Sequence, residues 1–274
     1  MRSLSTNEVK QAELSILLEF DAICRRHGLT YLLAYGTALG AARHQGFIPW
    51  DDDIDVVMPR DDYERVWDLS CRGELSERLK LTTYRDKSST YSFFKLTDPR
   101  TLVVESYLRE EFSSGLWIDI FPLERTRPGD PVERTWRACS RRLFLKAQRV
   151  ANPNAGTSAR AVAVKRVIAP LAQPFDPYRI AAAIERRARS LNRAPAECGA
   201  RKTMWACIDD LSSRTCLYPD DMLFPAGTAS FEGHELPVPY DLDGYLSHCY
   251  GNWRELPPEE ERRPHFPEAY SLEG

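Results

Sequence analysis

The stretch YGTALGAARHQGFIPWDDDIDVVMPR, residues 35–60, crowds four aspartates into five positions directly before an apolar run. Branched and apolar residues that alternate with acids and then become continuous indicate a strand over residues 53–58. Asp53 and Asp55 are two positions apart, so on a strand their carboxylates leave the same face, roughly 7 Å apart. The stretch therefore predicts a strand that carries a pair of neighbouring carboxylates on one face.

Like charges this close raise each other's pKa unless a cation lies between them, and oxygen ligands suit Mg²⁺ or Mn²⁺. Asp119 lies between two isoleucines on a later predicted strand and can supply a third carboxylate. We therefore expect Asp53, Asp55 and Asp119 to be metal ligands and catalytic residues.

Two other interpretations of the aspartates stay open. Charge runs often form a solvated turn before a strand, and Asp51 and Asp52 can serve as caps in such a loop. A calcium loop fits less well, because Val56 stands where the sharp turn needs glycine and Asp62 replaces the bidentate glutamate.

The Gly36-Thr37 pair opens a short predicted helix that runs through His44. Free amides at a helix N-terminus attract anions, and glycine allows a close approach, so this turn is a candidate phosphate site. Arg43 and His44 can add positive charge there, as can Lys95, for which a solvated surface lysine is the equal alternative.

The first 125 residues alternate between helical and strand patterns, which predicts an α/β (α+β) fold. A capping box at Ser5 and Glu8 begins an amphipathic helix that ends at Gly28. Further strands are expected over residues 30–35, 79–84, 91–96, 101–106 and 116–123, with a helix over 60–69. Residues 231–239 read as a hairpin and 241–251 as a capped helix.

The middle of the chain is basic and helical, with about three helices between residues 133 and 193. Residues 134–202 hold 16 Lys and Arg against 3 Asp and Glu, a balance of +13 that leaves −16 for the rest of a chain whose net charge is −3. We expect a core in residues 1–125, a basic insertion or subdomain in 126–215 and a segment completing the core in 216–274. The basic helices either contact an anionic membrane or pack on the core with solvated arginines, and the proline breaks slightly favour the second.

The composition argues against a disordered, a fibrous and a membrane-spanning protein. The chain has 274 residues, 43% hydrophobic and 28% charged, which is typical of a globular protein. It lacks an apolar stretch long enough to span a bilayer and a signal-peptide pattern at its start, so we expect it in the cytoplasm, at most peripheral on the inner face of the membrane. Its seven scattered cysteines lack the spacing of a common zinc site or a disulfide framework, and we expect no nucleic-acid partner.

Several long motifs together resemble those of the LicD family of phosphotransferases, which are relatives of fukutin and fukutin-related protein. The motifs are residues 35–66, FFKLTD (93–98), GLWIDIFPLE (115–124) and FEGHELPVPYDLDGYLSHCYGNWRELPPEEERRPH (231–265). Their order and spacing match over roughly residues 10–125 and 217–265, whereas residues 126–215 carry no matching motif. The resemblance implies a nucleotidyltransferase-like mixed sheet with flanking helices, in which Gly36, Thr37, Asp53, Asp55 and Asp119 occupy the motif positions.

The activity that the resemblance implies is transfer of a phospho-alcohol, such as phosphocholine, phosphoethanolamine or a polyol phosphate, from a CDP-linked donor. The acceptor is a hydroxyl of a glycan or other sugar, which can be lipid-linked, and CMP is released. Trp50, Arg262 and His265 are further candidates that would close the site around the donor.

Three rival functions use some of the same residues. A true nucleotidyltransferase would attack the α-phosphate of a nucleoside triphosphate and release pyrophosphate. A metal-dependent glycosyltransferase also uses an Asp-x-Asp pair but leaves the Gly-Thr turn unexplained. A non-catalytic protein that binds CDP-alcohols is the third.

Overall fold

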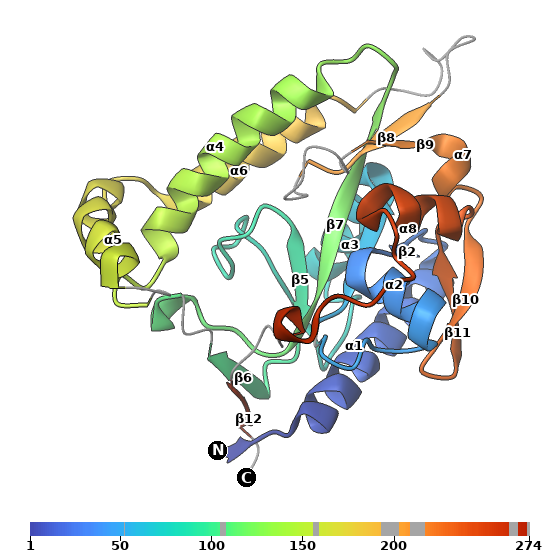
Figure 1. Cartoon of the computed structure of the whole chain (residues 1–274), viewed down its shortest axis with the longest axis horizontal. Helices are drawn as coiled ribbons and strands as arrows, with labels where there is room; N and C mark the ends of the chain where they lie inside the picture. Colours follow the sequence, from blue (N-terminus) through green and yellow to red (C-terminus); the bar gives the residue numbers. More distant parts are fainter. Residues whose placement is uncertain are drawn as a thin grey trace.

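A curled mixed sheet with flanking helices forms the centre of the molecule, which confirms the predicted α/β class (Figure 1). The computed structural model describes residues 1–51, 53–104, 108–155, 159–192, 203–208, 217–262 and 268–272. The strand order is β2-β3-β7-β5-β4, and the end of β7 continues the sheet through β8 and β9. These strands are β2 (Leu32–Leu33), β3 (Asp55–Pro59), β4 (Lys80–Thr82), β5 (Phe94–Thr97), β7 (Trp117–Thr126), β8 (Met204–Ala206) and β9 (Leu217–Pro219).

Strand β7 is the central element because it pairs in parallel with β3 and antiparallel with β5. Its residues Ile118, Ile120 and Leu123 are fully buried, as a strand with neighbours on both sides requires. The predicted strand over residues 91–96 is shifted in the structure, since β5 begins only at Phe94. Residues 91–93 therefore lie outside the sheet, where they can take part in a site.

Helix α1 (Thr6–His27) has the predicted ends and the predicted buried face. Ser5 and Glu8 form a reciprocal capping box, and Gly28 ends the helix in the left-handed conformation with φ 60°. The buried side chains include Ile16, Leu17 and Phe20, which recur at helical spacing and belong to the main core.

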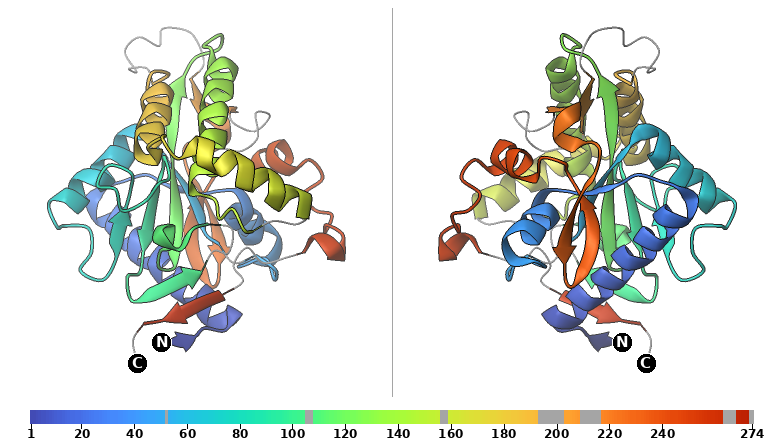
Figure 2. Two further views of the ribbon diagram at one scale, coloured as in Figure 1. Left: turned by 90° about the vertical axis from the view of Figure 1, so that its left-hand side faces the viewer. Right: turned by 90° about the vertical axis from the view of Figure 1, so that its right-hand side faces the viewer.

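The remaining helices of the core cover both sides of the sheet. Helices α1 and α3 (Arg60–Cys71) pack against β7 and lie together on one side of the sheet in Figure 2. Helices α2 (Tyr35–His44) and α8 (Leu242–Tyr250) contact each other and lie on the other side. The short helices η1 (Glu110–Phe112), α7 (Asp220–Leu223) and η3 (Glu259–Glu261) complete the connections.

Two small sheets extend the core. Strand β12 (Glu268–Ser271) lies between β1 (Arg2–Ser3) and β6 (Thr101–Val104), so the two ends of the chain are side by side (Figure 1). The predicted hairpin is formed by β10 (Gly227–Phe231) and β11 (His234–Val238). Its turn residues Glu232 and Gly233 both have positive φ, as the tight hairpin turn requires.

The described residues of the basic middle of the chain form three helices, the number that the pattern predicts. They are α4 (Val132–Val150), α5 (Ala159–Ala172) and α6 (Pro177–Arg189). Helices α4 and α6 lie side by side at one end of the molecule, toward which the C-terminal half of β7 extends (Figure 1). Their contact buries Cys139, Ile184 and Ala188 in a small apolar cluster that is separate from the main core. Pro170, which we expected to break a helix, lies inside the last turn of α5.

Within the described residues, no helix combines the length and the apolar character that a crossing of the bilayer needs.

Candidate active site

Two of the predicted acidic residues meet because of how the central strands pair. Asp55 is the first residue of β3 and lies directly opposite Asp119 in the parallel pair of β3 with β7. On the other side of β7, the antiparallel register sets Lys95 of β5 opposite the same Asp119. Residues Lys95, Asp119 and Asp55 therefore form a row across three neighbouring strands.

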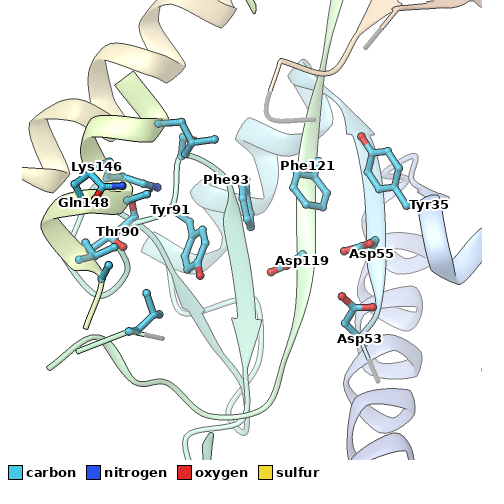
Figure 3. Close-up of a pocket in the computed structure, with 16 residues that line it drawn as sticks. Tyr35, Asp53, Asp55, Thr90, Tyr91, Phe93, Asp119, Phe121, Lys146 and Gln148 are labelled. Atoms are coloured by element: carbon cyan, nitrogen blue, oxygen red, sulfur yellow. The ribbon is translucent and has the colours of Figure 1, made fainter. Parts of the chain in front are cut away.

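Asp53 is close to this row, but it does not lie on the strand as the sequence suggested. The pairing with β7 begins where the amide of Asp119 donates to the carbonyl of Ile54 at 2.8 Å, so Asp53 lies before the first hydrogen-bonded residue. Asp53, Asp55 and Asp119 nevertheless line one pocket, with the first two on one side and Asp119 facing them (Figure 3).

The electrostatics of the row explain why a cation would be favourable there. Burial raises the pKa of Asp55 well above its usual range, and the neighbouring charges of Asp53, Asp119 and Asp51 raise it further. Burial also raises the pKa of Asp119, although Lys95 acts in the opposite direction. These carboxylates thus repel one another in a place where water screens them poorly.

Lys95 is buried, so the alternative of a solvated surface lysine is wrong. Its Nζ lies 3.0 Å from Oδ1 of Asp119 and 3.6 Å from the centre of the Trp117 ring. The same Nζ lies 4.4 Å from the centre of the Tyr91 ring. The ion pair and the ring faces together stabilise a buried charge at the edge of the carboxylate row.

Gly36 and Thr37 hold the acidic loop at the start of α2. The hydroxyl of Thr37 accepts a hydrogen bond of 2.8 Å from the amide of Asp55. A Cβ atom at Gly36 would lie only 2.5 Å from Oδ2 of Asp51, so a larger residue here would force that carboxylate to shift. Their expected contact with phosphate stays a prediction, whereas their contact with the acidic loop is visible.

A second group of predicted residues gathers around the far end of α2. Arg43 donates to the carbonyls of Trp253 and Glu255, at 2.9 and 3.4 Å. Trp50 packs between His44, whose ring centre is 6.2 Å away, and the guanidinium of Arg262 at 4.9 Å.

These four residues tie the segment after α8 to α2 and do not line the carboxylate pocket. Burial lowers the pKa of Arg43, and the charge of Arg262 lowers it further. Burial lowers the pKa of His44 too, helped by Arg43 and Lys10. The remaining predicted site residue, His265, falls outside the described residues.

The pocket beside the carboxylates has a volume of about 620 Å³ and contains residues that the sequence did not single out. Four aromatic rings line it, from Tyr35, Tyr91, Phe93 and Phe121. Phe121 and Phe93 each lie two residues from a predicted site residue, Asp119 and Lys95, so the period of a strand could have found them.

Helix α4 supplies the opposite side of this pocket, with Leu143, Lys146, Ala147 and Val150 among its lining residues (Figure 3). Lys146 is buried and donates to the carbonyl of Thr90 at 2.8 Å. The basic insertion is therefore part of the site and not only an appendage of the core.

The side chains fit a hard divalent cation by their chemistry, because all three candidate ligands are carboxylates and the charges of Asp53 and Asp119 raise the pKa of Asp55. Among the described residues, no three acidic, histidine or cysteine side chains are yet close enough together to hold an ion.

The comparisons with known proteins agree with this geometry. Residues 28–146 match the family model described as LicD/FKTN/FKRP, nucleotidyltransferase domain, and this range contains the whole carboxylate row and most of the pocket. The lipopolysaccharide cholinephosphotransferase LicD of Haemophilus influenzae is 28% identical over 284 residues, which cover 99% of this chain and all of that protein.

The chain carries a LicD-family domain over residues 28–146.

Uncharacterized proteins of Rickettsia prowazekii and Rickettsia typhi are similar to this chain over a shorter stretch. Each is 32% identical over 69 residues, which cover 22% of this chain and 26% or 22% of the relative. The match to the Haemophilus LicD protein differs in kind, because it runs through the basic insertion as well as the core.

Proposed function

We propose that this protein is a LicD-like phosphotransferase that moves phosphocholine, or a related phosphoethanolamine or polyol phosphate, from a CDP-linked donor to a sugar hydroxyl. The observation that carries the proposal is the row of Lys95, Asp119 and Asp55, whose two carboxylates line, together with Asp53, a pocket large enough for part of such a donor. The full-length similarity to a lipopolysaccharide cholinephosphotransferase supports phosphocholine as the group and a glycan as the acceptor.

The reaction would be an in-line displacement at phosphorus. The acceptor hydroxyl attacks the phosphorus of the phospho-alcohol group, the bond to CMP breaks, and CMP leaves with the bonding electrons. Asp119 is our candidate to take the hydroxyl proton, and Lys95 holds that carboxylate in place at 3.0 Å.

Mg²⁺ or Mn²⁺ bound by Asp53, Asp55 and Asp119 would supply neutralisation of charge on the donor diphosphate. Thr37 and Gly36 keep the acidic loop beside that position through their contacts with Asp55 and Asp51. Most of the catalysis would thus come from positioning and from charge.

The test is the identity of the leaving group. Purified protein is incubated with CDP-choline, CDP-ethanolamine, CDP-ribitol or CDP-glycerol and with lipopolysaccharide as acceptor, and CMP is measured by mass spectrometry. We expect CMP release that stops in EDTA and returns with Mg²⁺ or Mn²⁺. Pyrophosphate release from CTP without CMP release from any CDP-alcohol would instead identify a nucleotidyltransferase.

A further inference from the structure

Three aromatic rings form one continuous wall of the pocket beside the carboxylates. The ring centres of Phe93 and Phe121 are 4.3 Å apart, and Tyr35 meets Phe121 edge to face at 5.7 Å. All three are only half-buried, because each leaves part of its surface open to the pocket. Figure 3 shows Phe93, Phe121 and Tyr35 side by side, next to Asp119 and Asp55.

The strands place this wall one step from the carboxylate row. Phe121 follows Asp119 by two residues on β7 and therefore shares its face of the sheet. Phe93 directly precedes β5, whose first residue Phe94 pairs with Ile120, and its ring lies against that of Phe121. The rings thus lie roughly 7 Å along the strand from the carboxylates, a spacing set by the pleat.

Tyr35 reaches the wall through an unusual backbone conformation. Its φ of 44° lies in the left-handed region, which is uncommon for a residue other than glycine. The amide of Tyr35 donates to the hydroxyl of Tyr245 at 3.1 Å, which holds the turn at the start of α2. Strain of this kind persists where the surrounding structure imposes it, often at a ligand site.

The chemistry of the wall suits a cation that carries no hydrogen-bond donor. Ring faces carry partial negative charge and attract a quaternary ammonium group, and the attraction grows when water is excluded. Leu143, Ala147 and Val150 of α4 face the pocket from the other side and would exclude water. Tyr91 is already within 5 Å of two protein cations, Lys95 and Lys146, and is not included in this wall.

We propose that Tyr35, Phe93 and Phe121 bind the trimethylammonium group of the donor and select choline over ethanolamine and polyols. The inference rests on the proposed function, since the choline carbon chain must link this wall to a phosphate beside the carboxylates. An ammonium group needs hydrogen-bond acceptors and a polyol needs polar partners, neither of which ring carbons provide. The competing explanation is that these rings stack on the cytosine base. All CDP-linked donors share that base, so a comparison of donors separates the two explanations.

The decisive variant is Phe121→Leu, which removes the ring but keeps an apolar side chain, compared with Phe121→Tyr, which keeps the ring. We expect Phe121→Leu to lower kcat/KM for CDP-choline about tenfold or more and that for CDP-ethanolamine less than about twofold. Phe121→Tyr should keep the preference of the unchanged protein for CDP-choline over CDP-ethanolamine, because it keeps the ring. Leu143→Val, in the opposite side of the pocket, is the matched control and should affect both donors equally. Phe93→Leu repeats the test if the first variant has a lowered Tm.

An equal loss for both donors would overturn the proposal while leaving the function intact, because the wall would then bind a part that the donors share. Calorimetry with phosphocholine and phosphoethanolamine gives a readout without turnover. We expect the unchanged protein to bind phosphocholine more tightly and Phe121→Leu to lose that preference. If no donor releases CMP, the proposed function fails. If calorimetry also shows no preference for phosphocholine over phosphoethanolamine, the proposed role of the aromatic wall fails as well.

Discussion

Asp55 is the residue where function and stability oppose each other. Burial and the charges of Asp53, Asp119 and Asp51 raise its pKa, so ionising this carboxyl costs free energy in the folded protein. Such clusters occur at functional sites, where a charged ligand or a metal offsets the repulsion.

We expect Asp53→Asn, Asp55→Asn and Asp119→Asn each to lower transfer activity about a hundredfold or more, because each removes a charged ligand. Asp55→Asn should also raise the Tm measured in EDTA, since it relieves repulsion without changing the shape of the side chain. CMP release and thermal unfolding monitored by circular dichroism check the two effects. Near-normal activity in any two of the three variants would contradict the site.

Lys95 controls the protonation of Asp119 in our account. Burial raises the pKa of Asp119 and Lys95 lowers it, so Lys95→Met should raise that pKa further. A base with a higher pKa is protonated, and therefore inactive, at a higher pH. We expect the acid limb of the kcat/KM profile to move to higher pH in Lys95→Met and to stay near its original position in Lys95→Arg. If the acid limb does not move in Lys95→Met, Lys95 has no influence on the proton transfer and the prediction is wrong.

At the scale of elements, a buried ion network joins α3 and β7 of the core to α6 of the insertion. Arg60 of α3 is buried and donates to Glu124 of β7 through Nε at 2.9 Å and to Glu185 of α6 at 3.0 Å. Burial alone would lower the pKa of Arg60, but Glu124 and Glu185 outweigh it and raise the pKa. Arg85 binds Glu64 through two hydrogen bonds of 2.9 Å and also contacts Glu185.

Removing Glu185 should loosen the insertion from the core. We expect Glu185→Ala to lower the free energy of unfolding by about 3 kcal/mol, near the low end of the cost of breaking a buried ion pair, because Arg60 keeps Glu124. Glu133→Ala removes an exposed partner of Arg137 on α4 and should cost less than about 1 kcal/mol. Urea denaturation measures both, and equal costs would contradict the role of the network.

The pH dependence of the same network has a definite sign. Burial opposes ionisation of Glu64, but its hydrogen bonds with Arg85 and the charge of Arg60 lower its pKa below the ordinary 4.5. Its contribution to stability is therefore present above pH 4.5 and is lost as the pH falls through the lower, folded value.

At the scale of the whole molecule, the basic insertion presents apolar side chains to solvent. Val167 and Leu171 are one helical turn apart on α5 and are about 70% exposed, and Phe144 of α4 is 64% exposed. The apolar faces of α4 and α6 pack on each other in the cluster around Cys139, which is separate from the main core, whereas these three side chains face solvent. Exposed apolar residues within a block of +13 charge suit an anionic lipid surface.

We therefore expect the protein to float with anionic liposomes at low salt, where electrostatic attraction is least screened. The double variant Val167→Ser/Leu171→Ser should float less, because it loses apolar contact while its charge is unchanged. Tyr240→Ser changes an exposed aromatic residue outside the basic insertion and serves as the control. Protein that stays at the bottom of the gradient would refute the membrane contact and favour an acceptor that does not lie in a membrane.

The sequence alone determined the features that depend on near neighbours in the chain. The capping box at Ser5 and the left-handed Gly28 fixed the ends of α1, and period-two alternation predicted β3 and β7 with their acids. The motifs of the LicD family indicated the class of the protein, because several long stretches agreed in order and spacing. These signals are local or are read along the chain, so they need no knowledge of which elements touch.

The tertiary structure decided which of those residues meet. Alternation shows which residues share the face of a strand, but only the register of β3, β7 and β5 sets Asp55, Asp119 and Lys95 in one row. For the same reason Arg43 and Trp50, which are near the aspartates in sequence, lie outside the pocket, whereas Leu143 of the basic insertion lines it. Distance along the chain carries no information about such contacts, because they arise only when strands pair and a distant helix packs across them.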